Sequence, residues 1–168
     1  MQDIDYRFCP LCGGSLAERL LKPREPKRLV CTDCGFIFYI DPKLAVLALI
    51  PLQGGIVLVR RSIEPGYGLW VVPGGFVDLG ETVEEAVVRE AQEETGLTVR
   101  VERLLKVYSY RHSRTVLLAY VTRRLDGELV AGDEELEARV FAPRDIPWSL
   151  IAFSSSRDSL KDFFSLSP

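Results

Sequence analysis

Three glutamates in the middle of the chain have the spacing of a metal site on a helix. Glu90, Glu93 and Glu94 stand at positions i, i+3 and i+4, so a helix over this segment places all three on one face. Like charges at that spacing repel one another, and a bound cation would relieve the repulsion. Carboxylate oxygens suit hard ions such as Mg²⁺ or Mn²⁺. The spacing alone is equally compatible with a solvated acidic face.

The four cysteines form two pairs near the N-terminus, Cys9 with Cys12 and Cys31 with Cys34. Two residues separate the members of each pair and 18 residues separate the pairs, which is the spacing of a four-thiolate zinc site. Four thiolates close the coordination sphere of zinc, so the ion is expected to be structural. The alternative of two disulfides in a secreted protein is disfavoured, because no signal-peptide pattern opens the chain.

The composition fits one catalytic domain with a small accessory module. Of the 168 residues, 47% are apolar, which is enough for a core and excludes wholesale disorder. The formal net charge of −3 argues against a general surface for nucleic acid. No apolar run approaches the roughly 20 residues of a membrane span, so no membrane partner is expected. We expect a cytoplasmic protein.

The pattern of apolar residues predicts a mixed sheet with one dominant helix. The helix is expected over Thr82–Thr95, with Gly96 ending it, and a shorter helix begins near Ser154. Residues 123–135 are polar and are predicted to be a loop or a hairpin tip. Together these elements predict an α/β or α+β sandwich. Strands are expected over residues 44–50, 56–61, 70–72, 98–108, 115–122 and 136–141, the first two as a hairpin.

The segment GFVDLGETVEEAVVREAQEETGL, residues 75–97, resembles the Nudix box position by position. The resemblance implies an α/β/α sandwich in which Glu90, Glu93 and Glu94 bind Mg²⁺ or Mn²⁺. It also implies that Glu81 and Arg89 orient the helix and the ligand carboxylates. Gly74 and Gly75 would let the backbone pass close to metal and phosphate. The matching positions are Gly75, Glu81, Arg89, Glu90, Ala91, Glu93, Glu94, Gly96 and Leu97.

The cysteine motifs FCPLCGG and CTDCGFIFYIDPK, placed directly before the box domain, resemble the zinc-ribbon subgroup of Nudix hydrolases. This subgroup includes NADH pyrophosphatases and enzymes that act on ADP-ribose and FAD. The resemblance implies a zinc ribbon over residues 1–40 and a Nudix domain over residues 41–168. The Pro-, Gln- and Trp-rich signature of NADH pyrophosphatases is missing from residues 107–112, which argues against reduced nicotinamide dinucleotide as the substrate.

Two further site residues follow from the subgroup. A metal-site glutamate stands before an apolar-aromatic strand in these relatives, which implies Glu137, with Glu134 and Glu135 as alternatives. Phe76 matches a phenylalanine that stacks on a substrate base, and core packing is the alternative. His112, the only histidine, is expected to be an exposed loop residue and not a general base.

The expected reaction is metal-dependent hydrolysis of the diphosphate in a nucleoside diphosphate linked to another moiety, such as ADP-ribose, FAD or NAD(H). Glu94 or Glu137 would help to take the proton of the attacking water, and a nucleoside monophosphate would leave. Two alternatives stay open. One is an idle nucleotide sensor whose zinc ribbon docks nucleic acid or protein, and the other is removal of an RNA cap. A homodimer is expected from the relatives.

Overall fold

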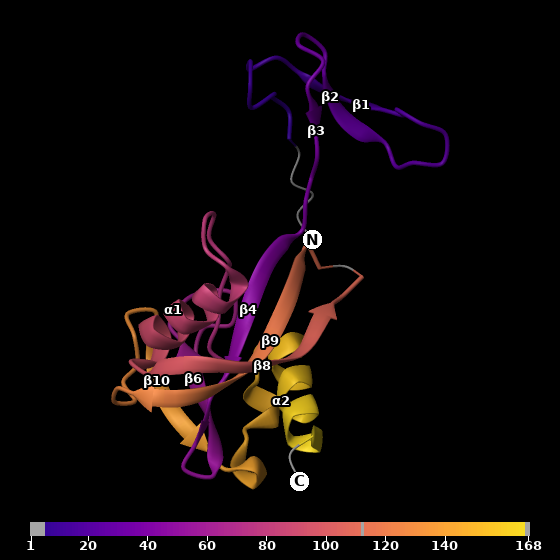
Figure 1. The fold of residues 1–168 in the computed structure, drawn as a ribbon. Coiled ribbons are helices and arrows are strands. Elements are labelled where there is room, and N and C mark those ends of the chain that lie inside the picture. Colours follow the sequence, from indigo (N-terminus) through magenta and orange to yellow (C-terminus); the bar gives the residue numbers. More distant parts are fainter. Residues whose placement is uncertain (1–5, 112, 167–168) are drawn as a thin grey trace. The chain divides into compact units, whose positions relative to one another are not determined.

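The computed structural model describes residues 6–111 and 113–166, and the chain divides into two compact units, Met1–Pro42 and Lys43–Pro168 (Figure 1). Each unit has its own sheet structure, so each is described by itself. Neither helix within the described ranges is both long and apolar enough to span a membrane.

The first unit is a small antiparallel sheet beside the cysteine turns. Its strands run in the order β1 (Leu16–Arg19), β2 (Arg28–Cys31) and β3 (Ile37–Phe38). Among the described residues of this unit, the buried apolar side chains are Cys9, Val30 and Cys31. A unit with so small a core rarely folds by apolar burial alone. A metal or a disulfide usually supplies the missing stability.

The second unit contains two sheets, one of them mixed. β4 (Lys43–Leu49) runs parallel to β9 (Thr115–Asp126), and β9 pairs antiparallel with β8 (Thr98–Ser109). This arrangement confirms the predicted mixed sheet. The other sheet is built around β6 (Gly55–Arg61), which pairs antiparallel with β10 (Glu135–Phe141), β5 (Pro51–Leu52) and β7 (Trp70–Val71).

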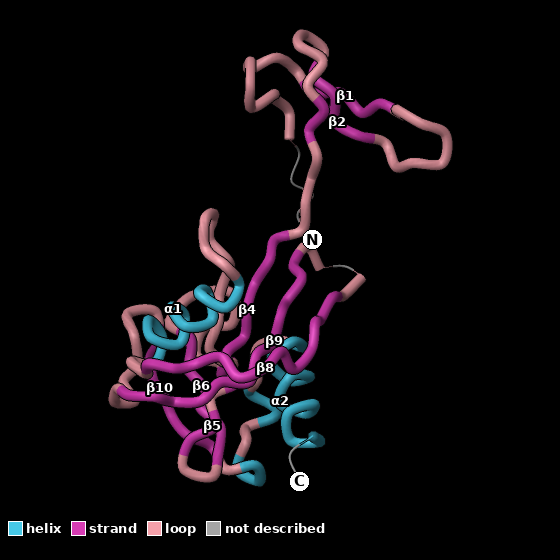
Figure 2. The backbone as a smooth tube through the Cα atoms, in the orientation of Figure 1, coloured by secondary structure: helices cyan, strands magenta, loops and turns pink. Residues whose placement is uncertain are grey.

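Two helices cover opposite faces of the strand layer, α1 (Val83–Thr95) and α2 (Ser154–Leu166) (Figure 2). The alternation of side chains along β4 explains this. Val46 and Ala48 pack into one core cluster with Ala86 and other α1 residues. Leu47 and Leu49 point the other way, into a second cluster that includes Leu160 and Phe163 of α2. Two short 3₁₀ turns, Pro143–Asp145 and Trp148–Leu150, precede α2. The result is the expected α/β/α sandwich.

Both ends of α1 are fixed by local hydrogen bonds. Thr82 caps the N-terminus: its side chain accepts a hydrogen bond of 3.2 Å from the Glu85 amide, while the Glu85 carboxylate accepts one of 2.7 Å from the Thr82 amide. At the other end Gly96 takes a left-handed conformation with a φ of 69°, and its amide binds the Gln92 carbonyl. The predicted start and end of the helix are confirmed.

The sheets differ from the sequence expectation in two places. β4 does not pair with β6, because the hairpin partner of β6 is the short strand β5 while β4 lies beside β9. The segment expected to be a loop from residue 123 begins as strand, since β9 continues to Asp126. There Arg123 and Arg124 pair with β8, and their exposed side chains gave the segment the composition of a loop.

Candidate active site

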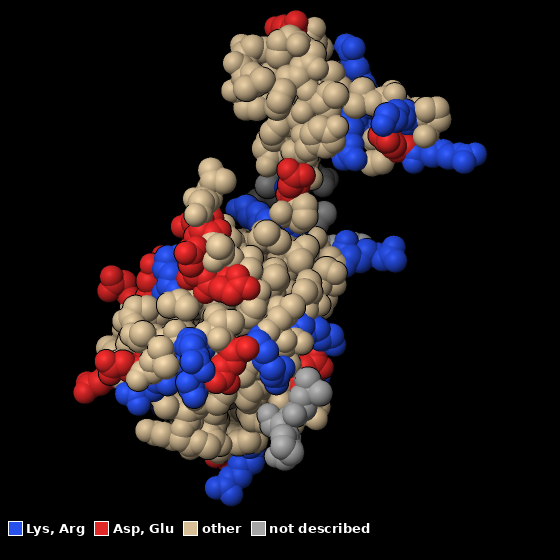
Figure 3. Space-filling model, in the orientation of Figure 1, with Lys and Arg blue, Asp and Glu red and all other residues tan. Residues whose placement is uncertain are grey.

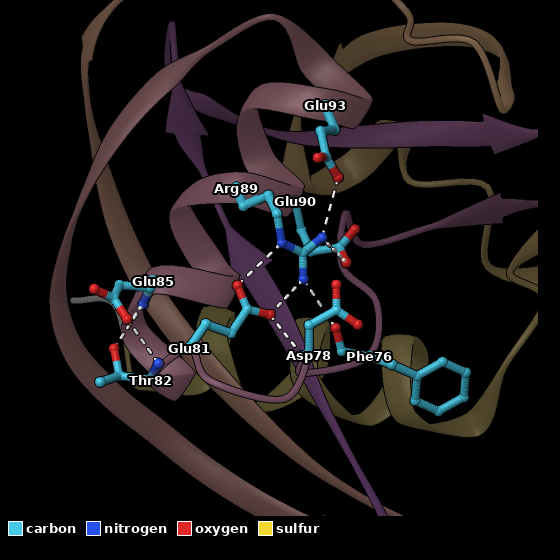
Figure 4. Close-up of polar contacts among 8 residues, drawn as sticks. All are labelled: Phe76, Asp78, Glu81, Thr82, Glu85, Arg89, Glu90 and Glu93. Atoms are coloured by element: carbon cyan, nitrogen blue, oxygen red, sulfur yellow. Dashed lines mark hydrogen bonds and ion pairs between the residues drawn. The ribbon is translucent and has the colours of Figure 1, made fainter.

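Arg89 on α1 is the hub of a hydrogen-bond network with three glutamates (Figure 4). Its Nε and Nη2 donate to the two carboxylate oxygens of Glu81, at 3.1 and 2.7 Å. Nη1 donates to Glu90 at 2.7 Å and to Glu93 at 3.1 Å, and Nη2 also donates to the carbonyl oxygen of Phe76 at 3.0 Å. A guanidinium has five N–H donors, so all of them are used. Arg89 therefore orients carboxylates and has no donor left for a substrate.

Glu81 anchors the loop before α1 as a carboxylate anion. The hydrogen bonds from Arg89 are the largest cause that lowers its pKa, to about 2, and the amide of Asp78 contributes by donating at 2.7 Å. Red side chains gather over the region of α1 in Figure 3, with blue ones among them. The acidity of this face is thus balanced in part by Arg89.

Glu90 and Glu94 are the two α1 carboxylates that line a cavity of about 930 Å³. Burial raises the pKa of Glu94 to about 8, although the amide of Gly74 donates a hydrogen bond of 2.9 Å to it and so lowers the value. Burial also raises the pKa of Glu90, which the ion pair with Arg89 opposes. The fold therefore disfavours negative charge at a place where it puts two carboxylates. A counter-ion is the feature that would resolve this conflict.

Gly74 and Gly75 pass between β4 and α1 without room for a side chain. A Cβ on Gly74 would lie 2.0 Å from the carbonyl oxygen of Val46, and the φ of Gly74 is 153°. A Cβ on Gly75 would lie 2.4 Å from a carboxylate oxygen of Glu90. The amide of Val46 binds the carbonyl of Gly75 at 2.8 Å, which holds the segment against β4. Gly74 is required by its close approach to the backbone of β4, whereas a side chain on Gly75 would displace the carboxylate of Glu90.

The structure does not bring the three predicted carboxylates to a common point. Glu93 is exposed and bound to Arg89, outside the residues that line the cavity. Among the described residues, the acidic side chains form no cluster of ligand atoms as tight as that of the cysteines. The cause is Arg89, because it draws Glu90 and Glu93 onto its own guanidinium.

The acidic segment at the start of β10 contains Glu137 and its two alternatives, Glu134 and Glu135, in different surroundings. Glu134 lines the cavity. Burial raises the pKa of Glu135 to about 7, and the charges of Glu134 and Glu90 raise it further. Glu137, in contrast, is paired with Arg139. A bulge in β10 explains the difference, since Glu135 lies opposite Arg61 and Glu137 opposite Arg60. Neighbours in a strand point to opposite faces, so Glu137 is turned away from Glu135.

Aromatic rings line the cavity as well as carboxylates. Phe76, Tyr110 and Phe153 line it, together with the serines at the start of α2. Phe76 is 50% exposed, and the Lys43 ammonium lies 4.6 Å from its ring centre, so the ring is not part of the core. Cavities of this size and character bind small organic ligands. His112 lies outside the described residues.

The four cysteines of the first unit form the tightest group of ligand atoms among the described residues, with all Sγ atoms within 4.8 Å of one another. The Sγ atoms of Cys9 and Cys34 are 3.8 Å apart, and those of Cys12 and Cys31 are 3.4 Å apart. Zinc–sulfur bonds of about 2.3 Å at tetrahedral angles place sulfurs about 3.8 Å apart. The amide of Cys34 also donates to Cys31 Sγ at 3.5 Å and lowers the pKa of this thiol. The geometry fits zinc.

Comparison with known proteins agrees with both units. The NUDIX domain family matches residues 41–163, and the Nudix N-terminal zinc-ribbon family matches residues 7–40. A protein named ADP-ribose pyrophosphatase from Methanocaldococcus jannaschii is 37% identical over 141 residues, covering 82% of this chain and 79% of its own length. A NAD-capped RNA hydrolase NudC from Salmonella heidelberg is 28% identical over 148 residues. That match covers 84% of this chain, which spans about half (54%) of the length of NudC.

Solved structures similar to this chain are also Nudix family proteins. A Nudix hydrolase from Nitrosomonas europaea superposes with a TM-score of 0.91 at 33% identity, covering 96% of this chain and 92% of its own. An ADP-ribose pyrophosphatase from Streptococcus suis has a TM-score of 0.61 at 29% identity, covering 75% of this chain and 93% of its own. The capped helix of the box, the glycine passage beside it and these matches together show that the chain belongs to the Nudix hydrolase family and carries the zinc ribbon of its zinc-ribbon subgroup.

Proposed function

We propose that the protein hydrolyses the diphosphate of ADP-ribose or of a related dinucleotide, with Mg²⁺ or Mn²⁺ as cofactor. The observation that carries the proposal is the position of Glu90 and Glu94. Both line a ligand-sized cavity, and the fold raises the pKa of both. The name of the relative from Methanocaldococcus jannaschii supports ADP-ribose as the first substrate to test.

The donor set fits a hard divalent cation, because every side chain in question offers carboxylate oxygens. We assign Glu90, Glu93 and Glu94 to hold it, which requires Glu93 to leave its contact with Arg89. Glu134 or Glu135 completes the set in place of Glu137, since these two face the cavity or interact with Glu94. When bound, such an ion neutralises diphosphate oxygens and makes a water molecule more acidic.

The reaction then follows from the placement of the side chains. Phe76 and the other rings of the cavity bind the nucleoside, and the backbone of Gly74 and Gly75 lines the same cavity beside the phosphates. Water attacks one phosphorus, and the bond to the bridging oxygen breaks, so that oxygen leaves with the second phosphate. Glu94, which lines the cavity, is the carboxylate that we assign to help take the proton of the water. The products from ADP-ribose are AMP and ribose 5-phosphate.

The zinc ribbon has a structural role in this proposal. Its four thiolates leave no open coordination position for chemistry. A cytoplasmic location and a homodimer stay predictions, and size-exclusion chromatography with light scattering tests the second.

The direct test is hydrolysis of a substrate panel by purified protein. The panel contains ADP-ribose, FAD, NADH and NAD-capped RNA, each with Mg²⁺ or Mn²⁺, and released AMP is measured by chromatography. Glu93→Gln and Glu94→Gln should each lower kcat by about 100-fold or more. Glu102→Gln is the matched control, because Glu102 lies on β8 in a surface pair with Arg123. Wild-type rates in both box variants would overturn the assignment.

NAD-capped RNA is the second candidate substrate, and the observation that favours it is the similarity to NudC. If capped RNA is the preferred substrate, kcat/KM should be higher for capped RNA than for free ADP-ribose or NAD. The idle-sensor alternative predicts tight nucleotide binding without AMP release. The carboxylates lining the cavity argue against it, since a sensor has no need of them.

A further inference from the structure

Arg61 is a cation at the wall of the cavity, which Arg89, Arg111 and four acidic residues also line, and none of the roles above uses Arg61. It stands at the end of β6, is half-buried, and lines the cavity together with Glu90 and Glu94. Burial raises the pKa values of both Glu94 and Glu135, and the positive charge of Arg61 lowers both. Arg61 is therefore close enough to the carboxylates to act on the same ligand.

Arg61 is held in place on several sides. Its Nε donates a hydrogen bond of 2.9 Å to the carbonyl oxygen of Pro65. The guanidinium carbon lies 5.2 Å from the ring centre of Phe153, within the range of a cation–π contact. Gly66 packs beside it, since a Cβ there would lie 3.6 Å from Cδ of Arg61. A long side chain that is already fixed loses little entropy when it binds a ligand.

The donors of Arg61 and Arg89 are used differently. All five donors of Arg89 are taken by Glu81, Glu90, Glu93 and the Phe76 carbonyl. Within the described part of the chain, Nε is the nitrogen of Arg61 that donates a hydrogen bond. The two terminal nitrogens of Arg61 keep the planar fork that matches two phosphate oxygens.

We propose that Arg61 binds the diphosphate of the substrate directly, through the fork of its terminal nitrogens. This inference rests on the proposed function, and it assigns the recognition of phosphate to a residue outside the Nudix box. The neighbouring rings bind the organic parts of the substrate, while Arg61 and the cation held by the glutamates share the charge of the two phosphates.

The strand supplies a matched control in Arg60. It precedes Arg61 directly and is exposed, and its Nε also donates to a carbonyl of the following loop, that of Gly68, at 2.9 Å. It points to the opposite face of β6 and does not line the cavity. Both residues are arginines, and both donate a hydrogen bond to a carbonyl oxygen of the same loop. Only Arg61 lines the cavity.

The experiment measures steady-state kinetics with ADP-ribose at saturating Mg²⁺ for Arg61→Gln, Arg61→Lys and Arg60→Gln. Loss of a hydrogen-bonded charge should raise KM in Arg61→Gln by about 10- to 100-fold, with kcat within about threefold of wild type. Arg61→Lys keeps the charge without the fork and should recover part of the loss. Arg60→Gln should stay within about twofold of wild type.

A binding measurement separates this inference from the proposed function. The dissociation constant of α,β-methylene-ADP, whose bridge cannot be hydrolysed, is measured by calorimetry for the same proteins. Weaker binding in Arg61→Gln than in Arg60→Gln supports a phosphate contact even if wild type hydrolyses nothing on the panel. Equal KM and equal affinity in the two variants overturn the role of Arg61 and leave the hydrolase proposal standing. If Arg61→Lys is as impaired as Arg61→Gln, Arg61 only anchors its loop, and the inference fails.

Discussion

The amide of Gly74 donates a hydrogen bond of 2.9 Å to the carboxylate of Glu94, which ties the strand-side passage of the Nudix box to the last turns of α1. The bond needs the backbone of Gly74 in a conformation that other residues avoid, and it needs the passage to lie directly against β4. The position of a carboxylate on a helix therefore depends on a residue that has no side chain.

Gly74→Ala should destabilise the second unit by about 2–4 kcal/mol and abolish turnover, because the new Cβ meets the Val46 carbonyl oxygen at 2.0 Å. Urea unfolding followed by circular dichroism measures the change. Gly54→Ala is the control, since Gly54 also has a positive φ but open space around it, and about 1 kcal/mol is expected there. An equal loss of unfolding free energy in the two variants would show that the close approach of Gly74 to β4 does not contribute to stability.

Stability of the metal-free protein should fall as the pH rises from about 4.5 to about 8. Glu94 has its ordinary pKa of 4.5 when unfolded and about 8 when folded, so between these values the folded state binds more protons. Glu135 shifts in the same direction, to about 7. Thermal melts over this range measure the slope, which Glu94→Gln should flatten. A melting temperature that rises with pH over this range would contradict the shift.

Added Mg²⁺ should stabilise the protein more at about pH 8 than at about pH 5, because the ion binds the carboxylate and not the acid. The same melts with and without Mg²⁺ measure the difference. A pH-independent gain would mean that the ion binds elsewhere.

The three glutamates near β10 can be ranked by substitution. Glu134→Gln and Glu135→Gln should each reduce kcat/KM, and the residue that completes the metal site should show at least about a 100-fold loss. Glu137→Gln should stay near wild type, because its partner is Arg139 on the same strand. A large loss confined to Glu137→Gln would restore the assignment that the sequence suggested.

Zinc removal should unfold the first unit and leave the second folded. A thiol-selective zinc chelator in excess Mg²⁺ is expected to unpair β1 and β2, so that trypsin cuts faster after Arg19, which ends β1, and after the half-buried Arg28, which begins β2. Limited proteolysis with mass spectrometry locates the cuts, and Cys12→Ser should give the same pattern without a chelator. Resistance of the ribbon after chelation would show that its apolar contacts suffice.

Much of the fold was predictable, because local chemistry determines it. The strand β4 is predicted by a continuous run of apolar residues, and the helix that ends at Gly96 is predicted by the spacing of its apolar residues and by its capping residues. Neither prediction depends on distant contacts. Which strands pair with one another was harder to predict. Nothing in residues 44–61 indicates that β4 lies beside β9 and not β6, because both partners are apolar strands.

The site was predictable only in part. The resemblance implied a positioning role for Glu81 and Arg89, and these two residues form an ion pair. The separation of Glu93 from the cavity was not predicted, because it depends on which carboxylates Arg89 binds. The choice among Glu134, Glu135 and Glu137 depended on a bulge, which moves every later side chain to the other face. Arg61 was missed for a similar reason. It is one of two adjacent arginines, and only the orientation of β6 decides which of them faces the cavity.

The contacts of Arg89 also bear on how the protein folds. Its ion pairs with Glu81, Glu90 and Glu93 neutralise part of the charge of the acidic helix from within the protein, so α1 does not depend on a cation to form. The four cysteines of the ribbon are free and close together, so the zinc that their geometry fits would be required as the unit folds. The proposed cation beside α1 could therefore bind after folding, whereas the proposed zinc would take part in it.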